Sequence, residues 1–350
     1  MRPTPTRFDK AGFAMTLFDL CRPHATLAIV GTAKNAGKTT CLNHLIERYE
    51  ALGVRMGLTS VGRDGEDIDA ITDRPKPRIT PPPGTLVATA QLSAKRSDAR
   101  LREIATTPFR TAIGPVSLYE VLSTGQVEVA GPVTVQDTVA LIKLLRAHGA
   151  KQVFVDGAID RRASASSEVA EGVVLATGLS LSEDPEEVAR HTLMQTRWLS
   201  LEASPYPDLP AQTGALTRSG EFIAWPAKTV IEQGETLIQW LPEDARCLSL
   251  TGALTEGVAK KLVLGRVEGL DVVVPDGTHL LLSPDTYDRL EARGIRFFAS
   301  RPVRLVAVTV NPTSPFGAAV SPDSFLSMMR DRLAPVPVFD VVFDRAAARL

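Results

Sequence analysis

A glycine-rich loop near the start of the chain, at residues 31–39, lies between two segments of different periodicity. Residues 27–30 before it form a continuous apolar run of strand length. Residues 38–52 after it repeat apolar side chains at helical spacing and meet a stop signal at Gly53. When a strand leads through a short loop into an amphipathic helix, the apolar side of that helix packs on the sheet to which the strand belongs. This unit therefore predicts an α/β fold with a largely parallel sheet.

The loop itself matches the full pattern G-x-x-x-x-G-K-[ST]. Its two glycines allow the backbone to wrap closely around an anion, and the following helix directs free N–H groups and its positive dipole end at the same point. The pattern predicts that Lys38 reaches the β- and γ-phosphates of a nucleoside triphosphate and that the Thr39 hydroxyl ligates Mg²⁺. The expected nucleotide-binding residues are Gly31, Asn35, Ala36, Gly37, Lys38, Thr39 and Thr40.

Two further residues are candidates for catalysis together with Lys38. Asp156 follows the apolar residues 153–155 and precedes Gly157, where a phosphate site of this kind carries its metal-side carboxylate. We expect Asp156 to hold Mg²⁺ through its water shell or to orient the attacking water; the alternative is an aspartate that caps the turn after a strand. Lys34 is a second lysine within the loop, and its alternative interpretation is a solvated side chain.

Acidic residues follow the next strand-length run, at residues 56–61. Asp64 and Glu66 lie beside glycines there, so we predict a segment that responds to the γ-phosphate and helps to hold Mg²⁺; an acidic surface loop is the alternative. Arg161 and Arg162 either contact phosphate or lie in a solvated loop. Residues 176–178 end a later strand and are expected to border the nucleotide base.

Strands and helices alternate along most of the chain, with one break. The polar, proline-containing stretch around residues 200–218 interrupts the pattern. We therefore predict an N-terminal extension at 1–24, a nucleotide-binding α/β domain at 25–200, a linker at 201–220 and a smaller α/β domain at 221–350. In the smaller domain, the turns at 276–278 and 311–317 follow strands and form either a partner or ligand surface or simple connections.

Composition limits the partners to be expected. Hydrophobic residues make up 44% of the 350 residues and charged residues 23%, and the formal net charge is −1. These values are ordinary for a soluble globular chain and indicate neither nucleic-acid nor membrane binding. Three widely spaced cysteines fit neither a disulfide framework nor a zinc site. We expect a cytoplasmic protein.

The loop with Lys34 resembles those of the signature-lysine class of phosphate-loop proteins, which includes partition ATPases and dethiobiotin synthetase. Together with the Asp156 strand, this resemblance implies a P-loop NTPase fold, a parallel sheet flanked by helices, over about residues 25–200. In some of these families the lysine reaches the nucleotide of a dimer partner, so the resemblance leaves open both a homodimer and a Lys34 that acts across it. Residues 35–40 are also similar to the loop of the molybdopterin-guanine dinucleotide biosynthesis B protein.

A narrower resemblance involves residues 59–66 with Lys76 and Pro77, residues 155–161 and residues 311–315. These segments resemble proteins associated with lysine 5,6-aminomutase reactivation. The resemblance implies an ATPase that helps an adenosylcobalamin-dependent aminomutase to exchange inactivated cofactor. Three functions stay open: such a switch-type ATPase, an ATP-dependent small-molecule kinase or ligase, and a nucleotide-binding accessory protein without turnover. The loop contacts phosphate and not the purine, so it does not distinguish ATP from GTP.

Overall fold

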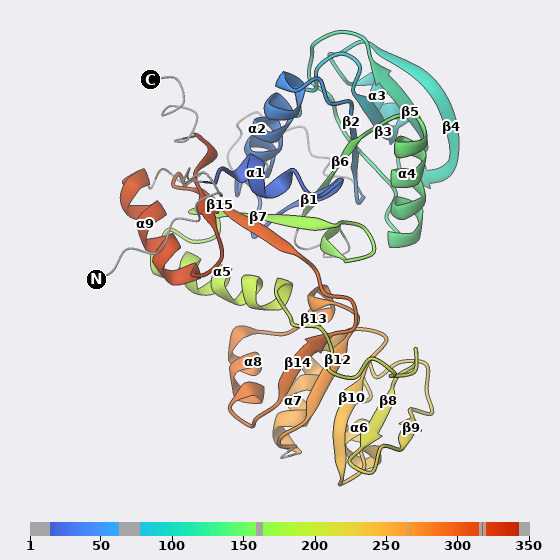
Figure 1. The fold of residues 1–350 in the computed structure, drawn as a ribbon, viewed down its shortest axis with the longest axis vertical. Coiled ribbons are helices and arrows are strands. Elements are labelled where there is room, and N and C mark those ends of the chain that lie inside the picture. Colours follow the sequence, from blue (N-terminus) through green and yellow to red (C-terminus); the bar gives the residue numbers. More distant parts are fainter. Residues whose placement is uncertain are drawn as a thin grey trace. The chain divides into compact units, whose positions relative to one another are not determined.

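The computed structural model describes residues 15–62, 78–158, 164–265, 267–314, 317 and 320–342. The chain divides into two compact units (Figure 1). The first unit comprises Met1–Leu193 and Leu305–Leu350, and the second comprises Met194–Arg304. The chain therefore leaves the first unit within helix α5 (Pro185–Leu199) and returns to it at the start of strand β15 (Leu305–Asn311).

This division corrects the linear one expected from the sequence. The expected C-terminal domain at 221–350 loses residues 305–350 to the first unit, because β15 joins the first sheet. The expected linker at 201–220 contains β8 (Gly214–Thr217), a strand of the second sheet. The expected extension at 1–24 contains α1 (Leu17–Cys21), which packs in the first core. An apolar run shows that a segment is a buried strand but does not show which sheet it joins.

A nine-stranded sheet forms the centre of the first unit, in the order β16-β15-β7-β1-β6-β2-β3-β5-β4. Neighbouring strands pair in parallel except at β5, which is antiparallel to both β3 and β4. The strands are β1 (Thr26–Gly31), β2 (Met56–Ser60), β3 (Leu86–Ala90), β4 (Leu101–Thr111), β5 (Gly114–Val121), β6 (Gln152–Ala158), β7 (Gly172–Gly178), β15 and β16 (Val338–Phe339). The inner strands β1 and β7 are buried along their whole length because both of their faces are covered.

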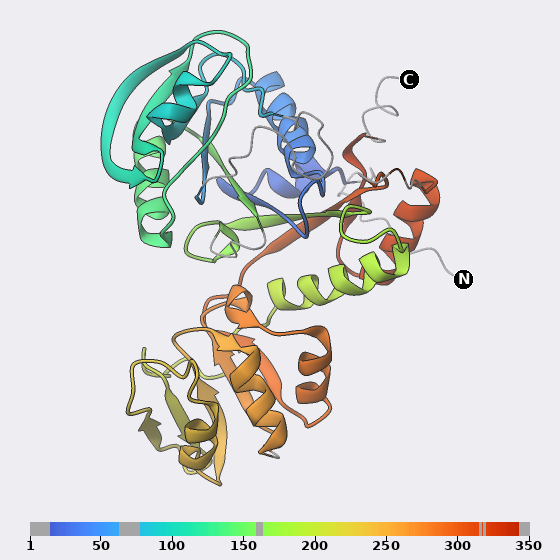
Figure 2. The same ribbon diagram turned by 180° about the vertical axis from the view of Figure 1, so that it is seen from behind.

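Helices cover both faces of this sheet (Figures 1 and 2). Leu58 of β2 belongs to the same core cluster as the apolar side of α2. Its neighbour Gly57 points to the other face, where an added Cβ would lie 3.4 Å from Cβ of Leu145 in α4. Successive strand residues face opposite sides, so α2 and α4 lie on opposite faces. The helices are α1, α2 (Lys38–Ala51), α3 (Gln91–Lys95), α4 (Val135–Ala147), α5 and α9 (Pro322–Leu333).

The second unit has a five-stranded sheet in the order β14-β12-β10-β8-β9. Its first three strands are parallel, and β8 is antiparallel to both β10 and β9. A separate pair, β11 and β13, is parallel. The elements are β8, β9 (Phe222–Ala224), α6 (Gly234–Trp240), β10 (Ala245–Ser249), β11 (Leu254–Thr255), α7 (Glu256–Leu264), β12 (Asp271–Val274), the 3₁₀ helix η2 (Gly277–His279), β13 (Leu280–Leu281), α8 (Pro284–Glu291) and β14 (Arg296–Ala299).

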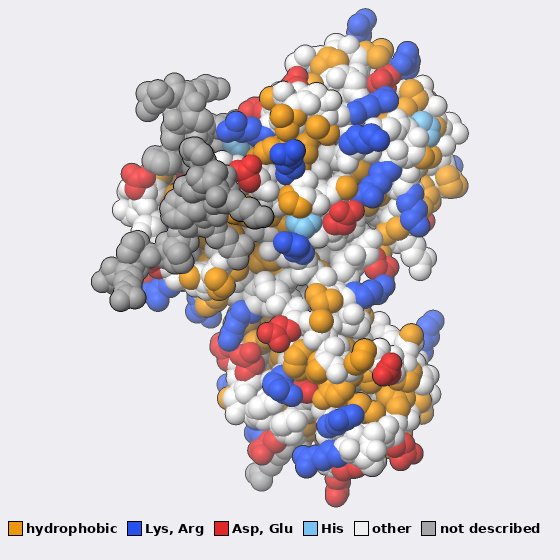
Figure 3. All heavy atoms as spheres, in the orientation of Figure 1, with side chains coloured by type: hydrophobic (Ala, Val, Ile, Leu, Met, Phe, Trp, Pro, Cys, Tyr) orange, Lys and Arg blue, Asp and Glu red, His pale blue; other side chains and the backbone are white. Residues whose placement is uncertain are grey.

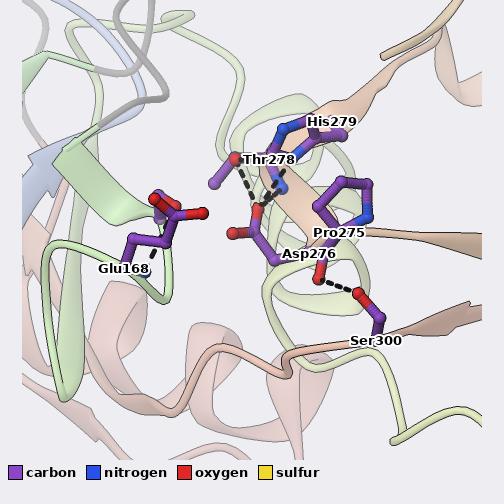
Figure 4. A network of polar contacts seen from close by, with 7 residues as sticks. Glu168, Pro275, Asp276, Thr278, His279 and Ser300 are labelled. Carbon is purple, nitrogen blue, oxygen red and sulfur yellow. Dashed lines mark hydrogen bonds and ion pairs between the residues drawn. The ribbon is translucent and has the colours of Figure 1, made fainter. Parts of the chain in front are cut away.

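The turn after β12 is closed by its own side chains (Figure 4). Oδ1 of Asp276 accepts hydrogen bonds from the amide of Thr278 at 3.0 Å and from its hydroxyl at 2.5 Å, and Nδ1 of His279 lies 3.1 Å away. An added Cβ on Gly277 would lie 1.7 Å from the carbonyl oxygen of Trp198, so a side chain does not fit there. These contacts favour the connecting-turn interpretation of residues 276–278.

Apolar side chains on the face in Figure 3 occur in small groups among polar and charged ones. Among the described residues, the most exposed large apolar side chains are Leu264, at 72%, and Val133, at 68%. No helix in the described part of the chain is both long and apolar enough to cross a bilayer.

Candidate phosphate-binding site

The 31–39 loop connects the carboxyl end of β1 to the amino end of α2, as its pattern predicts. Gly37 is the N-cap of α2 and has a φ of 98°, in the left-handed region that favours glycine. No side chain caps this helix end, and its first turn contains no acidic residue. The first turn of a helix has N–H groups without intrahelical acceptors. The loop therefore lies against backbone donors and the positive end of a helix dipole.

The side chain of Lys38 runs back across the end of β1. A Cβ added to Gly31 would lie 2.8 Å from Cγ and 2.9 Å from Cδ of Lys38. The lysine stem thus occupies the space that a side chain at position 31 would need. Thr39 and Thr40 follow in the first turn of α2 and are half-buried, whereas Lys34 is exposed on the loop.

Asp156 lies on β6, the strand beside β1. The parallel register pairs Asp156 with Ile29 of β1 and with Ser60 of β2. The carboxyl ends of these strands meet at one edge of the sheet, so the half-buried Asp156 lies at the same edge as the loop. Next to it, a Cβ added to Gly157 would lie 1.9 Å from Oγ of Ser164, which shows why glycine follows the aspartate.

The acidic segment after β2 is described only at its start. Asp64, Glu66, Arg161 and Arg162 lie outside the described residues, as do Lys76 and Pro77. Within the described part, the amide of Gly62 donates to the carbonyl of Pro132 at 2.8 Å, and Oγ of Ser60 accepts from the amide of Gly131 at 2.9 Å. The carboxyl end of β2 is therefore tied to the turn that precedes α4.

Asn311 at the end of β15 contacts the loop directly. Its Nδ2 donates to the carbonyl of Asn35 at 3.2 Å, and its Oδ1 accepts from the amide and hydroxyl of Thr313 at 3.2 and 2.7 Å. Asn35 has a φ of 62°, a conformation that asparagine tolerates better than most residues. A Cβ on Gly178 of β7 would lie 2.3 Å from the carbonyl oxygen of Asn311, so the two strand ends approach closely. The 311–317 turn, expected in a separate domain, therefore begins beside the phosphate loop.

A chain of hydroxyls supports the other end of the loop. Thr32 donates its amide to the carbonyl of Ala176 at 2.9 Å and its hydroxyl to Oγ1 of Thr177 at 3.0 Å. Thr177 is fully buried at the end of β7, and its Oγ1 lies 2.8 Å from Oγ1 of Thr192 in α5. Residues 176–178, expected to border the base, thus contact the start of the loop.

The core beneath the loop contains Cys41, one of three buried free cysteines. Burial raises the pKa of the Cys41 thiol to about 12, and a hydrogen bond with Thr309 of β15 only partly offsets this effect. The thiol is therefore protonated at neutral pH and serves as a core side chain, not as a nucleophile.

Sequence reasoning missed Thr192 and did not predict that Asn311 and Thr177 support the loop. Asn311 and Thr177 each follow an apolar run, which is a visible signal, but the strand order that brings these strand ends together is not visible in the sequence. The arrangement can hold an anion by backbone donors, a lysine and two hydroxyls, with a carboxylate at the same sheet edge. Comparisons with protein-family models, with curated protein sequences and with solved structures found no match to this chain.

Proposed function

We propose that this chain is a P-loop NTPase that binds ATP with Mg²⁺ at the 31–39 loop and hydrolyses it. The observation that carries the proposal is the path of Lys38 across Gly31, at the uncapped amino end of α2. A lysine stem held against a side-chain-free strand end keeps a positive charge beside a row of backbone donors. That combination suits the β- and γ-phosphates of a nucleotide.

Each residue of the site has a distinct role in this proposal. The backbone from Gly31 to Gly37 surrounds the phosphates, and Lys38 neutralises part of their charge. Thr39 and Asp156 are the hard oxygen donors that suit Mg²⁺. When bound, Mg²⁺ supplies further positive charge to the phosphate oxygens. Asp156 also accepts a proton from, or orients, the attacking water.

The physiological role we propose is that of a switch-type partner that reactivates a cobalamin-dependent aminomutase. This part rests on the resemblance of residues 59–66, 155–161 and 311–315, and not on geometry. In the same proposal Lys34 acts during hydrolysis, and its exposed position on the loop is compatible with reaching a bound nucleotide.

The test is to measure binding and steady-state hydrolysis of ATP and GTP by the purified chain. Lys38→Ala should weaken triphosphate binding about 10- to 100-fold, which corresponds to the loss of one to two charge-assisted hydrogen bonds. Lys95→Ala, at an exposed lysine of α3, is the matched control and should bind as the wild type does.

Equal triphosphate affinity in wild type, Lys38→Ala and Lys95→Ala would overturn the proposed site. Binding without hydrolysis under any condition would favour the accessory-protein alternative. Hydrolysis or transfer that begins only when a carboxylate or hydroxyl acceptor is added would favour the kinase or ligase alternative.

A further inference from the structure

The chain passes between the two units twice, and each of the two connecting segments is linked by hydrogen bonds to the phosphate loop. The chain enters the second unit through α5 and leaves it through β15. Thr192 of α5 is linked by hydrogen bonds to Thr32, and Asn311 of β15 is bonded to Asn35. One set of contacts lies at each side of the loop, and the two sets are joined through β7, because Thr177 is paired with Val310 of β15.

The α5 contacts form an ordered relay. Oγ1 of Thr192 donates to the carbonyl of Val188 at 2.7 Å, and Oγ1 of Thr32 donates to Thr177. A hydroxyl has one proton, so Thr177 must donate to Thr192. Thr177 and Thr192 are both fully buried, away from water that could replace a lost hydrogen-bond partner. Removing one hydroxyl of this relay therefore leaves another buried hydroxyl without a partner, which costs free energy.

Helix α5 continues without interruption from this relay into the second unit. Only two residues beyond Thr192, its side chains begin to join the second core. Met194 and Trp198 belong to that core cluster, and the ring of Trp198 packs edge-on against that of Tyr287 at 6.4 Å between centroids. A helix is rigid over so few residues, so displacement at Thr192 is passed on to Met194 and Trp198.

The second connection between the units, β15, also leads directly to the loop. The strand starts at the first residue after the second unit and is seven residues long. At its other end, the side-chain Nδ2 of Asn311 donates to the loop carbonyl of Asn35, and the backbone amide of Leu179 donates to the Asn311 carbonyl at 3.1 Å. The end of β15 is therefore bonded both to the loop and to the residue that follows β7.

We propose that Thr32, Thr177, Thr192 and Asn311 are positioning residues that couple nucleotide binding at the loop to the second unit through α5 and β15. The coupling rests on the proposed nucleotide binding. A phosphate bound by the loop backbone orders residues 32 and 35, and these order Thr192 and Asn311 in turn. By linkage, the factor by which bound nucleotide favours the ordered form of these contacts equals the factor by which the ordered form strengthens nucleotide binding.

Hydrogen exchange of the full chain, with and without saturating Mg-ATP, tests this coupling. In the wild type, nucleotide should slow exchange at residues 194–199 and 305–311 by about fivefold or more, the low end of typical allosteric coupling. Thr192→Val keeps the side-chain shape and removes the hydroxyl; it should lose the slowing at 194–199 and weaken nucleotide binding. Asn311→Ala should lose the slowing at 305–311.

Two controls separate coupling from packing. Thr192→Ser keeps the hydroxyl and should retain the wild-type response. Thr138→Val removes a fully buried helical hydroxyl that, like Thr192, donates to the carbonyl four residues earlier, but in α4; it should also respond as the wild type does. If Thr192→Val does not fold, Thr32→Val removes the first hydroxyl of the relay at a half-buried loop position.

The outcomes distinguish the two proposals. Loss of the α5 response in Thr192→Val or Thr32→Val, with both controls normal, supports the coupling. Normal nucleotide binding with no change of exchange at 194–199, or with a full response in these variants, overturns the coupling and leaves the nucleotide site intact. A wild type that binds no nucleotide overturns the proposed function, and the coupling with it.

Discussion

Two glycines at the carboxyl edge of the first sheet stand where a Cβ would collide with a neighbour. At Gly31 that neighbour is the flexible stem of Lys38, whereas at Gly178 it is the backbone carbonyl of Asn311, only 2.3 Å away. A lysine stem can move aside and a paired strand end cannot. Substitution at position 31 should therefore alter the site, and substitution at position 178 should alter the fold.

Gly31→Ala should displace Lys38 and weaken triphosphate binding about 10- to 100-fold, because a charge-assisted hydrogen bond is lost. Gly178→Ala should instead lower the free energy of unfolding by about 1–3 kcal/mol, as overpacking does. Calorimetric titration and thermal unfolding measure the two effects. Gly252→Ala, where nothing lies within 4 Å of the added Cβ, is the control for both. A Gly31→Ala protein with wild-type affinity would contradict the assigned path of Lys38.

Asp156→Asn should reduce ATP turnover about 100-fold while changing nucleotide affinity much less, because the carboxylate acts on water and on charge in the transition state. Phosphate release measures turnover, and titration with a non-hydrolysable analogue measures affinity. Normal Mg²⁺-dependent turnover in this variant would eliminate Asp156 from the site.

At the scale of elements, the helices follow most directly from the sequence. In α4 (Val135–Ala147) and α7 (Glu256–Leu264) apolar residues recur at helical spacing, and a glycine, Gly149 or Gly265, follows soon after the helix ends. Two segments whose composition favours strands pair less than expected. Residues 126–130 form bridges only at Val127 and Ala130, and residues 336–342 form a strand only at Val338–Phe339. The second segment contains Pro337, which has no backbone N–H to donate to a neighbouring strand.

The start of α7 is tied to the start of α8 by Glu256. Its carboxylate accepts hydrogen bonds from the Ser283 amide at 2.7 Å and from the Thr286 hydroxyl at 2.6 Å, and it pairs with Lys260. Burial raises the pKa of Glu256, but these hydrogen bonds outweigh burial and lower the pKa to about 2. The folded pKa is below the unfolded value of about 4.3, so this contribution to stability is present above pH 4.3 and is lost as the pH falls toward 2.

Glu256→Gln should therefore lower the free energy of unfolding by about 1 kcal/mol at neutral pH, since an amide cannot accept all of these hydrogen bonds. The difference from wild type should shrink as the pH falls from 5 toward 2. Chemical denaturation at several pH values measures it. Glu235→Gln is the control, because Glu235 is exposed and pairs only with Lys261 among the described residues. A difference that is constant over this pH range would exclude the assigned pKa.

At the scale of the whole molecule, the second unit is an insertion between α5 and β15 and not a C-terminal appendage. A unit held at both ends is better suited to report the state of the loop than one joined by a single linker. This arrangement agrees with a switch role, in which hydrolysis is controlled by a partner.

If the chain serves a cobalamin-dependent aminomutase, hydrolysis by the chain alone should be slow. An inactivated enzyme of that class should accelerate it at least about tenfold, as trans-acting partners of other NTPases do. Phosphate release with and without the enzyme measures the effect, and Lys38→Ala is the control for contaminating ATPases. Fast hydrolysis that needs no partner and is unaffected by Lys34→Ala would argue against the switch role.

The sequence by itself determined the local part of the site. Strand, glycine-rich loop and helix follow one another within residues 26–51, so their order is readable from the local pattern, and Lys38 is the first residue of α2. Only the tertiary structure decided what supports the loop. Asn311 is 276 residues from Asn35, and Thr177 is 145 residues from Thr32. Such contacts depend on which strands are neighbours in the sheet. Strand order is set by packing of the whole chain, and the periodicity of apolar residues within one segment does not specify it.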